Sequence, residues 1–304
     1  MRKLLFIPVF ILLLINAVTA QQLPIYSQNM LNDFSMNPAI AGTGNYFNLK
    51  SDNRFQWVGI TDAPRTYILT FDGPITAQHI GIGTYVFTDI TGPTRRTGIT
   101  SSYSYHMKLS NNLNLSLGLS AGILQFAVDG QSISLQQSND QALVNQLTSA
   151  IVPDFGGGVY LYGSRFYAGI AAPQIIPINA KLNSYADAKD IMVTHYYVTA
   201  GYNFDLGNNF NFDPCAVANY VYPAPPQLDL GARILYMQKF WIGGGFRTMD
   251  AAYALIGYVY QNNLTMGFSY DYPITDIHQY SFGTTEFYVG IKFNKPKHPN
   301  KSLM

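Results

Sequence analysis

A strict alternation of apolar and polar residues is the feature that most limits how this chain can fold. The segment 112–120 reads NLNLSLGLS, with leucine at every second position and only Asn, Ser and Gly between the leucines. Because successive side chains of a β-strand point to opposite faces, the pattern predicts a strand with one apolar and one polar face. The alternation alone leaves open whether the apolar face meets a protein core or lipid.

Segments of this kind recur along the whole chain, whereas helical periodicity is hard to find and no apolar run beyond residue 20 is long enough for a membrane-spanning helix. Recurring segments of about ten alternating residues are typical of outer-membrane β-barrels, which have an even number of strands. The alternation predicts fourteen strands, at 45–58, 65–73, 79–89, 96–109, 112–126, 155–163, 165–172, 194–206, 209–222, 227–237, 239–247, 251–260, 262–272 and 284–293.

The lengths of the connections alternate with the strands. Tight polar turns follow even-numbered predicted strands, and long connections such as 128–154 and 172–193 follow odd-numbered ones. Outer-membrane barrels have short periplasmic turns and long outer loops, so this order predicts an up-and-down barrel with both termini in the periplasm. A soluble sandwich has no reason to sort its connections in this way.

The composition also favours a membrane protein. Charged residues make up 12% of the chain, against about 25% in soluble proteins, and aromatic residues make up 14%. A secreted antiparallel sandwich or barrel would also show alternation, but so few charges would leave it too little polar surface for water. The 18 Lys and Arg residues nearly balance the 17 Asp and Glu residues, so there is no basic field to attract nucleic acid.

The charged residues of the predicted strands fall on the polar face. Because a charge facing lipid near mid-bilayer costs about 2–4 kcal/mol, we expect the polar face to line the barrel interior and the leucines to face lipid. The last strand of a closed barrel pairs with the first, which predicts an ion pair between Glu286 and either Lys50 or Arg54. The predicted interior charges are Lys50, Asp52, Arg54, Asp229, Arg233, Glu286 and Lys292.

The chain begins with a basic start, an apolar run and small residues at Val18-Thr19-Ala20. This is the pattern of a secretory signal peptide. The predicted organisation is a signal peptide at 1–20, an N-terminal periplasmic arm at 21–44, an outer-membrane barrel at 45–293 and a periplasmic tail at 294–304. The single cysteine, Cys215, has no partner for an internal disulfide.

Catalytic motifs do not emerge from the sequence. The five histidines are scattered without metal-ligand spacing, and no complete dinucleotide-binding motif is present. The one Gly-x-Ser-x-Gly match, at 118–122, lies within the predicted strand 112–126, so it does not form the strand-to-helix elbow of a hydrolase. An outer-membrane hydrolase could assemble Ser and His from different strands, but nothing selects a particular pair. We therefore expect a protein that is not an enzyme and that has no cofactor or metal site.

A series of short motifs carries a family resemblance over nearly all of the expected mature chain. In this order, the motifs resemble those of the PorP/SprF family of outer-membrane proteins of the type IX secretion and gliding systems. They include Ser27-Gln28, Asn37-Pro38-Ala39-Ile40-Ala41-Gly42, Gln56-Trp57-Val58-Gly59, Ala63-Pro64-Arg65-Thr66, Gly92-Pro93-Thr94-Arg95-Arg96, Pro153-Asp154-Phe155-Gly156, Phe246-Arg247 and Gly267-Phe268-Ser269-Tyr270-Asp271-Tyr272.

The resemblance implies a component of the type IX machinery that delivers or anchors secreted surface adhesins and contacts periplasmic secretion proteins. The alternative is an outer-membrane channel or transporter for small or hydrophobic solutes. The motif residues that become candidates for partner contacts are Asn37, Pro38, Gly42, Gln56, Trp57, Gly59, Pro64, Pro93, Arg95, Arg96, Asp154, Phe155, Arg247 and Asp271.

The segment NPAIAG has a physical interpretation of its own. Pro38 lacks a backbone donor and biases Asn37 away from helix, which suits an extended entry leading into a turn. Two interpretations remain open at this point. The segment packs against or partly plugs the periplasmic mouth of the barrel, or it belongs to an ordinary N-terminal arm.

Overall fold

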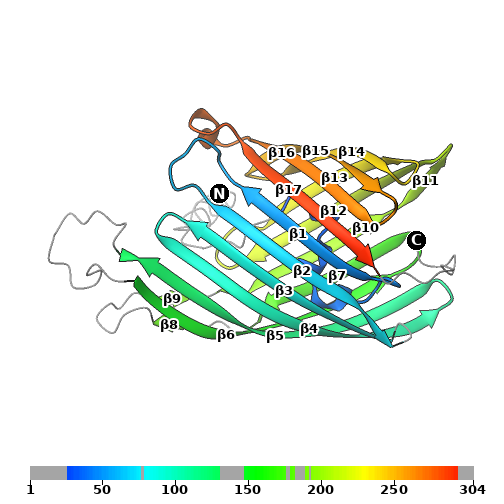
Figure 1. Ribbon diagram of the computed structural model, residues 1–304, viewed down its shortest axis with the longest axis horizontal. Coiled ribbons are helices and arrows are strands. Elements are labelled where there is room, and N and C mark those ends of the chain that lie inside the picture. Colours follow the sequence, from blue (N-terminus) through cyan, green and yellow to red (C-terminus); the bar gives the residue numbers. More distant parts are fainter. Residues whose placement is uncertain are drawn as a thin grey trace, which may run out of the picture.

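The computed structural model describes residues 26–76, 79–130, 147–175, 179–181, 189–191 and 193–293, and there it forms a closed antiparallel β-barrel of fourteen strands (Figure 1). The strands are β1 (Phe47–Phe55), β2 (Arg65–Thr76), β3 (Ile80–Thr91), β4 (Thr94–Ser110), β5 (Leu113–Asp129), β6 (Leu147–Tyr162), β7 (Phe166–Gln174), β10 (His195–Tyr202), β12 (Phe210–Val221), β13 (Gln227–Tyr236), β14 (Phe240–Arg247), β15 (Ala251–Tyr260), β16 (Leu264–Pro273) and β17 (Thr284–Phe293).

Each wall strand pairs with its neighbours in the chain, and β1 pairs with β17 to close the barrel. A short strand, β11 (Phe204–Gly207), follows β10 and pairs with the start of β12. Within the described residues, no helix is long and apolar enough to cross a membrane. The predicted fold class is therefore confirmed, while the predicted signal peptide and tail lie outside the described residues.

The alternation sorts side chains between the two faces of the wall. On β5, Leu117 and Leu119 are 45% and 70% exposed, whereas Ser116, the residue before Leu117, is fully buried. On β17, Val289 is exposed and Glu286 is fully buried. A water-soluble barrel would bury its apolar face, so this arrangement is that of a barrel whose outer surface meets lipid. The predicted assignment of the faces is confirmed.

The wall is much taller on one side of the barrel than on the other. Strands β4 and β5 have 17 residues each and β6 has 16, whereas β13 to β17 have 8 to 10. About 9–11 residues of a tilted strand cross a bilayer, so β4 to β6 project beyond it, on the left in Figure 1. The sequence predicted the sixth strand only from residue 155, eight residues after β6 begins at Leu147.

The tight turns lie together at the other end of the barrel. Asn208 and Asn209 both have positive φ, as do Gln261 and Asn262, which is the backbone of the two-residue turns that suit twisted hairpins. The predicted separation of short turns from long loops is present only in part, because the connections at 92–93 and 248–250 are also short although they lie at the long-loop end. The connection between β7 and β10, which was predicted as a loop, carries a separate two-stranded sheet of β8 (Asn179–Lys181) and β9 (Lys189–Ile191).

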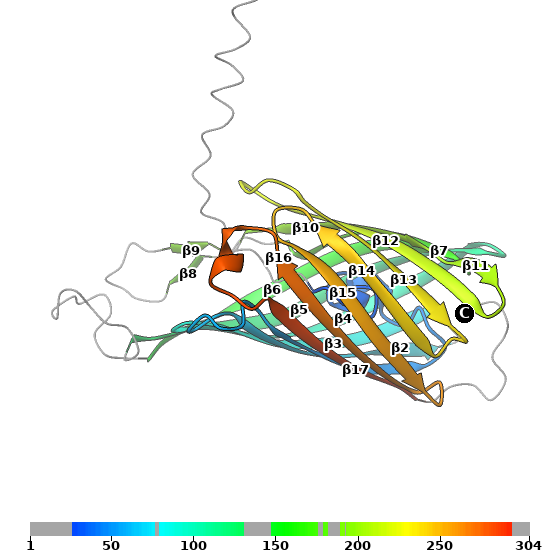
Figure 2. The same ribbon diagram turned by 90° about the horizontal axis from the view of Figure 1, so that it is seen from above.

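Residues 26–42, which we call the plug, lie inside the barrel (Figures 1 and 2). The plug contains two short 3-10 helices, η1 (Asp33–Ser35) and η2 (Pro38–Ile40). It begins at Tyr26, which packs with Ile68, Leu124 and Val152 in the half of the barrel nearer the long loops. It ends at Gly42, beside Gly73 and Gly81 at the short-turn end. Residues 26–42 of the predicted arm therefore lie inside the barrel, and of the two interpretations of NPAIAG the structure supports packing as a plug.

Candidate functional site

The start of the plug sits in a cluster of buried charges, which we call the anchor cluster. Its members come from β1 and from four of the five strands β13 to β17, so one side of the wall surrounds the plug at this level. Each member is at most 3% exposed. The anchor cluster consists of Arg54, Asp229, Arg247, Asp271 and Glu286.

The anchor cluster binds Ser27 and Gln28 by both backbone and side chain. The Glu286 carboxylate accepts hydrogen bonds from the backbone N–H groups of Ser27, at 3.0 Å, and Gln28, at 2.8 Å. The Ser27 hydroxyl donates to Asp271 at 2.7 Å and accepts from Arg54 at 3.3 Å and Arg247 at 3.1 Å. Both the N–H group and the hydroxyl of Ser27 thus bond to charged side chains. Such hydrogen bonds are stronger than those between neutral groups.

Ion pairs hold the anchor cluster together. Arg54 bridges Asp271 Oδ2 at 2.9 Å and Glu286 Oε2 at 3.0 Å. Arg247 pairs with Asp229 Oδ2 at 2.9 Å and lies 3.5 Å from Asp271 Oδ2. Removing one partner of a buried pair leaves an uncompensated charge, so the members depend on one another.

The predicted ion pair across the β1–β17 seam is confirmed with Arg54 as the partner of Glu286. The other candidate, Lys50, lies 3.4 Å from Asp33 of η1 and so contacts the plug. Glu286 with Arg54, and Lys50, were predicted only to line the interior, but both also hold the plug in place.

A second anchor fixes the end of the plug. The Ala41 carbonyl accepts a hydrogen bond from the Ser104 hydroxyl at 2.6 Å, and His106 Nε2 lies 2.9 Å from the same oxygen. The Tyr162 hydroxyl is 3.0 Å from His106 Nδ1. A histidine that donates from Nε2 to Ala41 accepts from Tyr162 at Nδ1, so both ring nitrogens are used in holding the plug.

The middle of the plug is fitted closely to the wall. Asn37 caps η2 by accepting from the Ala39 N–H at 2.9 Å, and it donates to the Val159 carbonyl at 3.2 Å. Pro38 occupies the first helical position, where its missing N–H is no loss. A Cβ added at Gly118 would lie 2.3 Å from the Ala39 nitrogen, so a glycine there is needed for the backbones to approach.

Motif residues in the connection between β1 and β2 close that loop and join it to the start of β17 and the loop before it. The Trp57 N–H donates to the Thr284 hydroxyl at 3.1 Å, and the Gln56 N–H donates to the Pro64 carbonyl at 2.9 Å. Gly59 has a φ of +100° and leaves no room for a Cβ against the Phe282 ring. These residues therefore shape the outer rim and do not touch the plug anchors.

The other predicted site residues are dispersed. Arg96 pairs with Asp89, Arg233 pairs with Asp213 at 2.9 Å, and Lys292 stacks over the Tyr46 ring at 4.6 Å. Pro93 lies in the turn between β3 and β4, and Arg95 is the second residue of β4. Phe155 faces outward, whereas Asp52 and Asp154 face inward. Of the motif candidates, the structure brings only Arg247 and Asp271 into the anchor cluster.

Sequence reasoning missed the role of several plug contacts. Ser27 and Gln28 were recognised only as a motif, and Ser104 and His106 were not singled out as a pair. The signal that was available is the set of interior-facing glycines on β3, β5 and β6, since Gly83, Gly118 and Gly158 all make room for plug atoms. Among the described residues, no group of His, Cys, Asp and Glu is arranged to hold a metal ion.

Comparison with solved structures shows the fold. The Ralstonia pickettii toluene transporter TbuX matches with a TM-score of 0.50 and 12% identity, covering 91% of this chain and 96% of that one. The CymD monoaromatic hydrocarbon channel matches with a TM-score of 0.50 and 12% identity, covering 89% and 94%. A search of curated proteins finds no match.

A family model gives the relationship. The model described as type IX secretion system membrane protein PorP/SprF matches residues 18–291, which include the plug and nearly all of the barrel. The matched span contains both halves of the site, since Ser27-Gln28 and the anchor cluster all lie within it. The chain therefore belongs to the PorP/SprF family of type IX secretion system membrane proteins.

Proposed function

We propose that this protein is a non-enzymatic outer-membrane component of the type IX secretion or gliding machinery that delivers or anchors secreted surface proteins. Family membership supports a place in the secretion apparatus. The observation that carries the anchoring role is the plug, which is fixed at both ends and in the middle by the barrel wall. A barrel filled in this way is suited to holding partners at its two faces.

The proposal includes an orientation. We assign the short-turn end to the periplasm and the long loops to the cell surface, following the rule for outer-membrane barrels. β1 then starts and β17 then ends on the periplasmic side, where contacts with periplasmic secretion proteins are expected. The projecting strands β4 to β6 and the joined outer loops are then available to a surface adhesin or other cargo protein.

Deleting the gene and comparing the surface and culture-medium proteomes tests this function. We expect one or a few secreted proteins to leave the cell surface, either lost to the medium or held in the cell, and the wild-type gene to restore them. An unchanged surface proteome together with impaired uptake of small solutes would overturn the proposal.

The alternative, a channel for small or hydrophobic solutes, requires a continuous path through the barrel. The plug contacts β5 and β6 through η2 on one side and the anchor cluster on the other, which argues against a steady open path. Purified protein in planar bilayers should therefore show no large, steady conductance. Stable porin-like channels from a folded sample would favour the alternative.

A further inference from the structure

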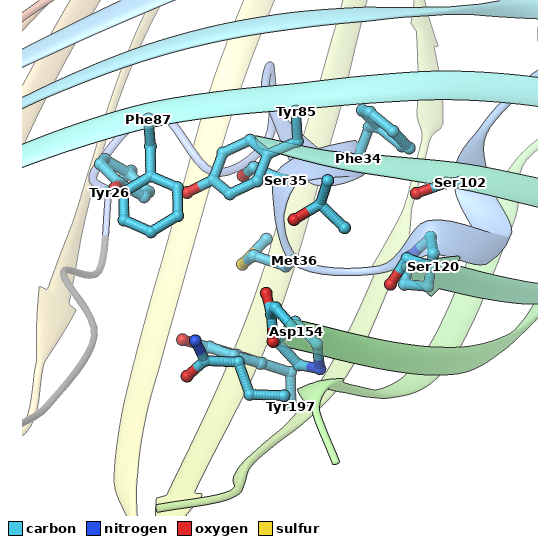
Figure 3. A pocket seen from close by; sticks show the side chains of 14 residues that line it. Tyr26, Phe34, Ser35, Met36, Tyr85, Phe87, Ser102, Ser120, Asp154 and Tyr197 are labelled. Atoms are coloured by element: carbon cyan, nitrogen blue, oxygen red, sulfur yellow. The ribbon is translucent and has the colours of Figure 1, made fainter. Parts of the chain in front are cut away.

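A cavity lies between the plug and the barrel wall in the half nearer the long loops (Figure 3). Its lining includes Gln174, the last residue of β7, and Tyr197 near the start of β10, both at the long-loop end of their strands. The cavity has a volume of about 60 Å³, which is more than the roughly 10–15 Å³ that a single water occupies. It therefore has room for a small organic group.

Where the structure describes it, the lining of the cavity carries a single charged side chain. Of the described residues that line the cavity, Asp154 is the only acid and none is basic. The Asp154 side chain is buried, and its carboxylate points toward Met36 of the plug, between Tyr197 and the rings of Tyr26, Tyr85 and Phe87 (Figure 3). The other polar side chains of the lining, such as Thr100 and Gln174, are uncharged, so none of them neutralises the carboxylate.

Aromatic rings surround this carboxylate on more than one side. Tyr26, Phe34, Tyr85, Phe87 and Tyr197 all line the cavity. Ring faces attract cations, and the attraction grows when water is excluded. A single carboxylate in a cavity lined by aromatic side chains, with no basic side chain among the described lining residues, can recognise an organic cation by its charge and its apolar stem together.

We propose that this cavity is a binding site for a primary ammonium group on a short apolar stem, with Asp154 as its counter-ion. A free alkylamine and a lysine side chain share this chemistry. The site goes beyond the proposed anchoring function and does not depend on it, because the cavity is formed by the barrel and plug alone.

Ligand-observed saturation-transfer NMR on the full-length protein in a non-ionic detergent tests the site. n-Butylammonium should show saturable binding, and the neutral isostere n-butanol should bind at least tenfold more weakly. Asp154→Asn should weaken n-butylammonium binding at least tenfold. The matched control, Asp276→Asn, removes an exposed loop carboxylate and should leave binding unchanged.

Two further arms complete the test. A short blocked peptide with one lysine, compared with the same peptide carrying norleucine, shows whether a polypeptide side chain can also supply the ammonium group. Ser120→Leu fills the cavity while leaving Asp154 in place, so it should abolish binding. This variant keeps the test decisive if a heat-modifiability gel shows that Asp154→Asn folds poorly. The site is overturned if neither ammonium probe binds wild type, or if Asp154→Asn or Ser120→Leu, each folded, binds as wild type does.

Discussion

Arg54 and Glu286 face each other as direct partners across the seam where β1 meets β17, with 3.0 Å between Nη1 and Oε2. The same Glu286 carboxylate holds the backbone of Ser27 and Gln28. Closure of the barrel and binding of the plug therefore share one carboxylate. Several consequences of this coupling can be measured.

Charge reversal at the seam should destabilise the barrel. Glu286→Lys places a second positive charge beside Arg54, and stranding a buried charge costs about 3–5 kcal/mol. The heat-modifiable folded fraction on a gel should fall, and adding Arg54→Glu should restore part of it. Restoration should be incomplete because the lysine cannot accept from the Ser27 and Gln28 amides. A double variant no better folded than the single one would contradict the pairing.

Removing the Ser27 hydroxyl should loosen the start of the plug. Ser27→Ala leaves Asp271, Arg54 and Arg247 each without one hydrogen-bond partner, a loss of about 1–3 kcal/mol. Amide hydrogen exchange over residues 26–32 should become faster. Ser35→Ala, which removes a hydroxyl bonded only to the Asn32 carbonyl within the plug, is the control, and equal exchange in both variants would count against the anchor.

Filling the glycine contact with η2 should displace the middle of the plug. An alanine Cβ at Gly118 would meet the backbone of Ala39 at 2.3 Å, and overpacking of this kind costs about 1–3 kcal/mol. Gly118→Ala should raise protease cleavage within the plug or produce brief openings in planar bilayers. Gly157→Ala on the neighbouring strand, where the atom nearest to the new Cβ is Ile175 Cδ1 at 3.3 Å, should behave as wild type.

A charge on the outer face should impair insertion. Val289 is 43% exposed on the outside of β17, so Val289→Lys should cost up to about 2–4 kcal/mol, depending on its depth in the bilayer. The yield of folded protein in membranes should drop. Ile274→Lys, in the loop after β16, changes a residue of the same exposure (43%) at the rim and should be tolerated. A harmless Val289→Lys would show that this face is not in lipid.

The proposed orientation predicts a labelling pattern. In a Cys215→Ser background, a single cysteine at Asp276 in η5 (Asp276–Gln279), which lies in the long loop after β16, should react with an impermeant maleimide in intact cells. A cysteine at Asn111, in the tight turn between β4 and β5, should react only after lysis. The opposite pattern would invert the barrel.

The sequence predicts the wall of this protein far better than its interior. Strand number, faces and even the Glu286–Arg54 pair follow from alternation, because period-two patterning is local and barrel closure pairs the last strand with the first. The plug contacts do not follow, because Ser27 meets Asp271 and Glu286 across 244 and 259 residues of chain. The upper part of β6 was missed because Ala150 and Val152 on its inner face are apolar and pack in the cluster around Tyr26, so apolar and polar residues do not alternate there.

The direction of the plug bears on how the molecule is assembled. Within the described residues, the plug runs from Tyr26, near the long loops, to Gly42 at the short-turn end, and β1 begins after it. A segment that runs the height of the barrel inside a closed wall is difficult to thread in afterwards. We expect β17 to pair with β1 only after Ser27 and Gln28 have reached their positions. The plug would then act as the template on which the barrel closes.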